Sequence, residues 1–383
     1  MKKALALVLA LVMMACVCMA CAKKTNDEPK DAEGGYKIAY TSNYLGNSWR
    51  TQYEEAIRTR FDQYKEKGVV SDYTFVACNS DVTEQLNQLN ALLQEDYDLI
   101  MIDAVSASSL TSVIEEANEK GVKILLGNTI CPYEGVTCIS ADLASVYAKA
   151  DAYYLCDKLD GKGDIVEMFG VAGQGTCELF ELAAQEVFDQ YDINILAKTN
   201  GYWNDADAQT EMATLLSTYG ESIDGIFCED GMTYGIINAY LNAGEATVPV
   251  GGDYFNSFIQ YWYNNQDTLD TIMIPNSPYA TGTALVDCCV YMCAGYEVQA
   301  DQFIANPLDT TVNNWCALAM PYIVLEKDEM NASWLSNFPN TAVMSLDDAH
   351  ALMDGKEETA AIPLYFDDDY IAGLFGLEKS LWW

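Results

Sequence analysis

The sequence predicts an α/β protein built from two doubly wound domains, each with a parallel β-sheet. Its 383 residues are about two to three times the usual length of a domain, so each domain could bury a core of its own. Its apolar runs are continuous rather than alternating, which is typical of parallel strands covered by helices on both faces. The alternation of strand and helix ends and then begins again, which indicates two domains rather than one long sheet.

The first series begins at Tyr36 and alternates short apolar runs with longer amphipathic segments. Strands are expected at residues 37–41, 73–78, 98–102, 122–126 and 136–139. Helices are expected at residues 48–67, 82–95, 106–120 and 142–159. Gly121 marks the end of the third of these helices, because glycine readily adopts the left-handed conformation that closes a helix.

The second series repeats this pattern. Strands are expected at residues 164–169, 193–198, 224–228, 248–251 and 269–274. Helices are expected at residues 176–191, 205–219, 231–242 and 256–265. After Pro275 and Pro278 a further helix is expected at 280–294, and the pattern does not fix its domain. The pattern also leaves residues 331–383, a C-terminal extension, without a predicted position.

The N-terminus has the features of a secretory signal. Lys2 and Lys3 precede an apolar run that ends in small residues at Ala20, and a polar stretch follows. This junction resembles a bacterial lipobox, so we expect a signal peptide at 1–20, a lipid on Cys21 and a tether at 21–35. Cys16 is a competing lipidation site, and an ordinary cleaved signal is the alternative.

The composition excludes several classes of function. Lys and Arg number 20 against 57 Asp and Glu, and this formal charge of -37 would repel a nucleic acid. His350 is the single histidine, and it stands in neither a triad nor a metal-binding spacing. Gly170 and Gly173 follow a strand, but their spacing is not that of a dinucleotide-binding turn. We therefore expect no cofactor, no metal and no catalytic residue.

Most of the 13 cysteines stand in apolar runs, where a free thiol packs as a small hydrophobic group. Cys288, Cys289 and Cys293 share a predicted helix with apolar neighbours, which favours packing over metal binding. Cys131 and Cys138 flank a loop, and the sequence leaves open whether they form a disulfide.

Polar and aromatic side chains gather in the turns that follow the predicted strands, where doubly wound sheets bind their ligands. The turns are Ser42 to Arg50, Asp103-Ala104, Gly127-Asn128, Gly170 to Gly173, Gly201 to Asn204, Glu229-Asp230 and Gly252 to Tyr254. Carboxylates and amides bond to hydroxyl groups, and flat aromatic rings cover C–H faces. This lining therefore indicates a small polyhydroxylated solute.

The lipobox, the two βα series and the turn Asn47-Ser48-Trp49-Arg50 together resemble the type I, ribose-binding-like solute-binding lipoproteins of bacterial ABC sugar importers. The resemblance implies that a three-segment hinge joins the domains. It implies a first domain at 36–141 plus 277–314 and a second domain at 142–276 plus 315–330. The ligand-binding residues that it implies are Tyr44, Asn47, Trp49, Arg50, Asn128, Phe180, Trp203, Glu229, Asp230, Asp253 and Asn276.

Two positions depart from the ribose-binding pattern. Gly127-Asn128 stands where those proteins have Asp-Arg, and Glu178 and Phe180 stand where they have an arginine. Because both arginines supply hydrogen bonds to hydroxyls, the sugar is expected to differ or to carry an amine that the carboxylates neutralise.

The resemblance implies a monomer, tethered to the outside of the membrane, that captures a sugar in an inter-domain cleft and delivers it to the permease subunits of an ABC transporter. Two alternatives stay open. One is an exported glycosidase that uses two of Glu229, Asp230 and Asp253. The other is a sensor that presents its closed form to a receptor. The structural alternative to ligand binding for Asp230 and Asp253 is that each caps a helix. For Trp49 and Trp203 it is that each packs in the core.

Overall fold

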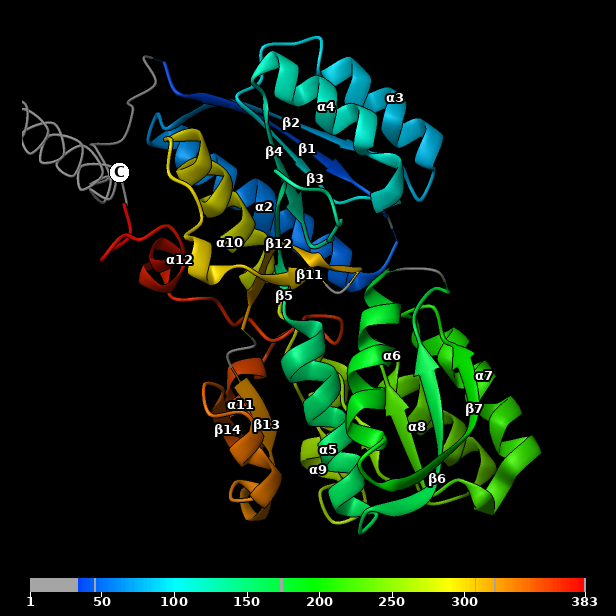
Figure 1. Cartoon of the computed structure of the whole chain (residues 1–383). Helices are drawn as coiled ribbons and strands as arrows, with labels where there is room; N and C mark the ends of the chain where they lie inside the picture. The colour runs from blue at the N-terminus through cyan, green and yellow to red at the C-terminus, as the bar shows by residue number, and fades with distance from the viewer. Residues whose placement is uncertain (1–33, 45, 173–174, 307, 320–321, 382–383) are drawn as a thin grey trace, which may run out of the picture.

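The computed structural model describes residues 34–44, 46–172, 175–306, 308–319 and 322–381. The expected signal peptide, the cysteines Cys16 and Cys21 and residues 21–33 of the tether lie outside these residues. Figure 1 shows two lobes, one above the other, with several segments of the chain passing between them.

The first lobe contains a seven-stranded sheet in the order β11-β12-β5-β4-β3-β1-β2. β11 and β12 pair antiparallel, and the other pairs are parallel. The strands are β1 (Tyr36–Ser42), β2 (Val70–Ala77), β3 (Leu99–Ile102), β4 (Lys123–Gly127), β5 (Thr137–Ala141), β11 (Ile304–Asn306) and β12 (Asp309–Leu318). The helices are α2 (Ser48–Glu66), α3 (Val82–Leu92), α4 (Thr111–Lys120) and α10 (Pro278–Cys293).

The second lobe contains a five-stranded parallel sheet in the order β10-β9-β8-β6-β7. The strands are β6 (Lys162–Phe169), β7 (Asp192–Asn200), β8 (Gly225–Cys228), β9 (Val250–Gly251) and β10 (Thr271–Ile272). The helices are α5 (Lys149–Lys158), α6 (Gly175–Phe188), α7 (Asp205–Tyr219), α8 (Thr233–Ala243) and α9 (Asn256–Asn264). A π-helical turn, η2 (Leu143–Ala148), precedes α5 within the expected helix.

The predicted fold class is confirmed: two doubly wound lobes follow from two βα series. The continuous apolar runs are the buried strands, since all four residues of β3 and of β8 are buried. On α2 the apolar residues recur at helical spacing, so one face packs against the sheet while the other faces solvent. Its buried aromatic residues are Trp49, Tyr53, Phe61 and Tyr64.

The chain passes between the lobes after β5, before α10 and after β12. The third crossing was expected before Trp315, and this boundary is wrong, because Trp315 pairs with Cys138 of β5 inside the first sheet. β12 continues to the buried Leu318, so the crossing lies after that residue. β13 (Tyr322–Leu325) then joins the second lobe through a bridge between Val324 and Met273.

The C-terminal extension, which had no predicted position, belongs to both lobes. β14 (Ala342–Ser345) pairs with β13, and α11 (Leu346–Met353) packs against α9 of the second lobe. α12 (Asp368–Leu374) packs against α10 of the first lobe, where Asp368 forms an ion pair with Arg60. Figure 1 shows α11 and α12 at these two separate places. The segment between them, residues 355–366, is therefore a fourth connection between the lobes, and we call it the C-terminal strap.

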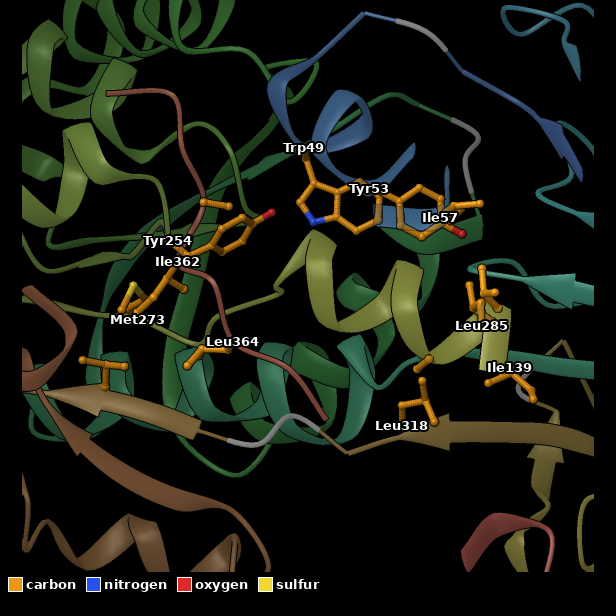
Figure 2. Close-up of a cluster of buried hydrophobic side chains, with 14 of the residues drawn as sticks. Trp49, Tyr53, Ile57, Ile139, Tyr254, Met273, Leu285, Leu318, Ile362 and Leu364 are labelled. Carbon is orange, nitrogen blue, oxygen red and sulfur yellow. The ribbon is translucent and has the colours of Figure 1, made fainter. Parts of the chain in front are cut away.

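The strap is held on both sides of the hinge. In the second lobe, the backbone of Asn256 donates to Ala360 (2.8 Å), and Ile362 donates to Tyr254 (3.0 Å). In the first lobe, the Gln52 amide donates to the carbonyl of Thr359 (2.9 Å) and accepts from the N–H of Ala361 (2.8 Å). Ile362 and Leu364 of the strap belong to one hydrophobic cluster with residues of both lobes. Figure 2 shows Ile362 beside Tyr254 and Met273 of the second lobe, and Leu364 further along the strap.

We expect Gln52→Ala to lower the free energy of unfolding by about 1–3 kcal/mol, because it leaves polar groups of the strap without their partner. Urea denaturation of the ligand-free protein measures this. Gln63→Ala is the matched control, since Gln63 is exposed on the same helix. Equal denaturation midpoints for the two variants would show that the Gln52 contacts contribute no stability.

The cysteines of the described residues are free thiols. The disulfide that Cys131 and Cys138 could have formed is not present: the N–H of Cys131 instead lies 3.5 Å from the sulfur of Cys138, as a weak hydrogen bond inside the loop. Across the same part of the chain, the structure contains no helix of the length and apolarity that a membrane span requires.

Candidate ligand-binding cleft

A cavity of about 110 Å³ lies between the two lobes at the carboxyl ends of their strands. Because each water molecule needs about 10–15 Å³ of such volume, the cavity has room for several waters. A cavity of this size suits one solute of monosaccharide size. The residues that line it are Asn43, Tyr44, Asn47, Trp49, Arg50, Ser80, Asn128, Leu143, Val171, Thr176, Trp203, Glu229, Asp230 and Asn276.

The first turn of α2 forms the wall on the first lobe. The Asn47 side chain accepts from the N–H of Arg50 (2.8 Å), so it caps the helix and lies at the cavity together with the residues it orders. This capped turn presents Trp49 and Arg50 to the cavity from a rigid helix end.

Arg50 is a buried cation with a buried partner. Its guanidinium forms an ion pair with Asp103, and the Tyr40 hydroxyl also donates to that carboxylate (2.8 Å). Burial is the largest single influence and lowers the pKa of Arg50, but the charge of Asp103, the neighbouring Tyr40 and Tyr53 and the bond to Asp103 together raise it by more, so Arg50 stays protonated. Arg50 Nε is buried and has no hydrogen-bond partner among the described residues. It therefore supplies an unused donor at the cavity.

Trp49 and Asn276 connect the cavity to the hinge. The Trp49 indole stacks on Tyr53 (centroids 4.8 Å apart) and donates to the backbone carbonyl of Asn276 (2.8 Å). Asn276 donates through Nδ2 to Asp230 (3.0 Å). Trp49 is thus both a packing residue and a wall of the cavity, and its role in ligand binding stays a prediction.

Trp203 forms the opposite wall, and Gly170 provides the space for it. A Cβ at position 170 would stand 1.9 Å from Cε2 of the Trp203 ring, so only glycine allows the indole to lie there. Trp203 and Tyr202 both have positive φ (52° and 59°), a conformation that side chains other than glycine seldom adopt. Such strain is concentrated at functional sites.

Glu229 and Asp230 complete the wall of the second lobe. Glu229 is 2% exposed and accepts from the N–H of Gly170 (2.7 Å) and the thiol of Cys177 (3.1 Å). Asp230 accepts from the hydroxyl of Tyr254 (2.7 Å) as well as from Asn276. Burial raises the pKa of both carboxyls, and the charge of Asp230 raises that of Glu229 further.

The structure brings nine of the eleven expected ligand-binding residues to this cavity and leaves two outside it. Phe180 is fully buried, with its ring 5.0 Å from that of Phe227 in the core of the second lobe. Asp253 is 2% exposed, and its carboxylate accepts from the N–H of Tyr254 (2.6 Å). The carboxylate bonds to the backbone of the turn before α9, whose N-cap position, Phe255, has no side-chain cap bond, so the helix-capping interpretation of Asp253 is not supported either.

Five lining residues were not among those expected: Asn43, Ser80, Leu143, Val171 and Thr176. Asn43 and Val171 stand in post-strand turns that the sequence already singled out. Ser80 follows β2 in a turn with positive φ (66°), and the rule that ligands bind at the carboxyl ends of strands would have found it. Thr176 and Leu143 stand in helical segments, where no local signal distinguishes them.

Polar atoms of three lining residues are buried without a partner among the described residues: Asn43 Oδ1, Arg50 Nε and Asn276 Oδ1. Buried polar groups in proteins nearly always have partners, so these atoms are candidates for bonds to a polar solute. Within the described residues, no cluster of three or more acidic, cysteine or histidine side chains has the arrangement of a metal site.

Comparison with known proteins agrees with this geometry. The family model of the periplasmic binding protein domain matches residues 38–297, which is more than half of the chain. The chain belongs to the periplasmic binding protein family. Among relatives of this binding protein, a xylitol-binding protein of Mycolicibacterium smegmatis is 29% identical over 179 residues, covering 46% of this chain and 51% of the relative. The alignment thus spans about half the length of that relative.

A ribose import binding protein of Bacillus subtilis is 21% identical to this binding protein over 255 residues, covering 66% of this chain and 82% of the relative. Among solved structures, an ABC transporter solute-binding protein of Thermobispora bispora superposes with a TM-score of 0.64 at 20% identity. That superposition covers 86% of this chain and 99% of the other. The two-lobed arrangement is therefore that of the solute-binding proteins.

The empty binding protein should become more stable as the pH falls. Burial first, and then Asp230, raise the pKa of Glu229 from 4.5 to about 7. A raised folded-state pKa gives stability that is complete below the unfolded pKa of about 4.5 and lost as the pH rises through about 7. At about 1.4 kcal/mol for each unit, we expect a change of about 3 kcal/mol over this range.

Urea denaturation of the ligand-free protein at several pH values measures this slope. Glu229→Gln should make it shallower, because glutamine takes up no proton, while other buried carboxyls with raised pKa values, such as Asp151 and Asp253, keep their part of the slope. Glu221→Gln, an exposed position in the same lobe, should leave it unchanged. A slope in Glu229→Gln equal to that of the wild type would contradict the assignment of the proton to Glu229.

Proposed function

We propose that this protein captures one small polyhydroxylated solute, a sugar or polyol, in the cleft between its lobes and delivers it to the permease subunits of an ABC transporter. The observation that carries the proposal is the set of unpartnered polar atoms on residues that line one cavity between the lobes, with two indoles in its walls. Hydroxyl groups both donate and accept, so a polyol can satisfy Arg50 Nε and the two amide oxygens together. The relatives named for xylitol and ribose support this class of solute.

The cavity also bears on the alternative of an exported glycosidase. Such enzymes place two carboxylates on either side of the scissile bond. Here Glu229 and Asp230 are consecutive residues of one turn, and Asp253 lies outside the cavity with its carboxylate bonded to the N–H of Tyr254. The family consists of substrate-binding proteins, which agrees with a role in binding rather than turnover.

Membership of the family also implies an extracytoplasmic location. We propose that the mature protein is a monomer anchored through a lipid on Cys21, since an apolar run ends before this residue and a polar stretch follows it. The mass of the N-terminal peptide tests the anchor, and an unmodified terminus would refute it.

A panel of sugars and polyols tests the function. The melting temperature should rise with the solute that binds, because a solute at about one hundred times its dissociation constant stabilises the folded state by about 2.7 kcal/mol. The same mixtures should contain no product after prolonged incubation. Release of product would favour the glycosidase, and no shift with any member of the panel would contradict the proposed function.

A further inference from the structure

The cavity carries an excess of acidic groups on one side. Among the residues that line it, three are charged in water at neutral pH: Arg50, Glu229 and Asp230. The charge of Arg50 is matched by Asp103, with which it forms a buried ion pair. Glu229 and Asp230 therefore face the cavity with no matching cation among the described residues that line it.

The partners that these carboxylates have are neutral groups. Glu229 bonds to the N–H of Gly170, the thiol of Cys177 and the side chain of Trp203. Asp230 bonds to the hydroxyl of Tyr254 and the amide of Asn276. Neutral donors orient a carboxylate without cancelling its charge.

Two further polar atoms on this side, Asp230 Oδ1 and Asn276 Oδ1, are acceptors. Both bonds to Asp230 reach Oδ2, which leaves Oδ1 available to a solute. Asn276 is 6% exposed, and its Nδ2 must face the acceptor-only carboxylate, so its Oδ1 is left as an acceptor. That Oδ1 has no partner among the described residues. A protonated amine has three donors and no acceptor, and it therefore matches this set better than a hydroxyl does.

We propose that the solute carries a protonated amine that lies against Glu229 and Asp230, so that the cleft selects amino-deoxy sugars or amino polyols over their neutral parents. This rests on the proposed function, since it names the class of solute for the same cleft. The amine supplies the missing positive charge and donates to Asp230 and Asn276. The hydroxyls at the other end of the solute meet Arg50 Nε and the amide of Asn43.

Titration calorimetry near neutral pH with matched probes tests the selection. The probes are an amino-deoxy hexitol, the hexitol of the same configuration, an amino-deoxy hexose, its parent hexose and its N-acetyl derivative. We expect each amine to bind at least about tenfold more tightly than its neutral partner, which corresponds to about 1.4 kcal/mol. Acetylation should remove this advantage, because the amide keeps the nitrogen but carries no charge.

Variants connect the preference to the two carboxylates. Asp230→Asn and Glu229→Gln should each reduce the preference for the amine from at least about tenfold to within about threefold, because each variant replaces one of the two carboxylates with a neutral amide. Asp207→Asn removes an exposed charge from the same lobe and should retain the full preference. Tighter or equal binding of the neutral probes by the wild type would overturn the inference and leave the proposed function standing. A preference that survives in both amide variants would also overturn it. Binding of none of the probes would contradict both.

Discussion

Replacing Arg50 with methionine should abolish solute binding and lower the free energy of unfolding by about 3–5 kcal/mol, because it leaves the carboxylate of Asp103 buried without its cation. Asp103 is fully buried, and without Arg50 its carboxylate retains the hydroxyls of Tyr40 and Tyr53 as donors. Binding should be lost because Nε is an unused donor at the cavity.

Urea denaturation and titration calorimetry measure the two effects of Arg50→Met separately. Arg58→Met is the matched control, since Arg58 is exposed on the same helix and contacts the ring of Phe75. That contact contributes about 0.5–1 kcal/mol to stability, so Arg58→Met should lower the free energy of unfolding only slightly. Its affinity for the solute should equal that of the wild type. A double variant with Asp103→Asn should recover part of the stability but none of the binding. Recovery of binding would show that Arg50 acts only on Asp103.

Gly170→Ala should weaken solute binding as much as Trp203→Ala does, by about 0.5–3 kcal/mol, although it removes no ligand-contacting atom. The added Cβ would stand 1.9 Å from the Trp203 ring, so the indole must leave its place in the wall. Both variants should keep the fold, because Trp203 is only half-buried in the absence of solute.

Calorimetry on the two variants tests this equivalence. Gly373→Ala is the control for the substitution itself, since a Cβ there meets no atom within 4 Å and Gly373 lies in α12, far along the chain from the cleft. If Trp203→Ala weakened binding and Gly170→Ala did not, the placement of the indole over Gly170 would be wrong. Wild-type affinity in both would remove Trp203 from the site.

The sequence predicts the two βα series because buried parallel strands need long apolar runs, and these runs are visible without a structure. It also predicts most of the cavity, because parallel strands of one sheet end at the same edge and their turns meet there. Phe180 was placed by resemblance alone. It faces the core from the middle of α6, where a large apolar side chain is buried against Tyr147 and Phe227. Asp253 does follow a strand, but its carboxylate turns back to its own backbone.

The strap and the strand pair β11–β12 were not predicted from the sequence. The strap makes its hydrogen bonds to Gln52, Tyr254 and Asn256 through backbone groups, and backbone bonding leaves no periodic pattern of side chains. β11 has three residues, of which two are exposed, so it has no apolar run. The boundary near Trp315 was wrong for a related reason: the family pattern supplied it, whereas the length of β12 depends on its pairing with β5.

The crystal structure of the complex with the tightest-binding member of the sugar and polyol panel tests the central claim most directly. We predict electron density for one solute molecule in the cavity between the lobes, against the indole of Trp203 and within hydrogen-bond distance of Arg50 and Asp230. Density for the solute at any other place, with this cavity holding only water, would contradict the account.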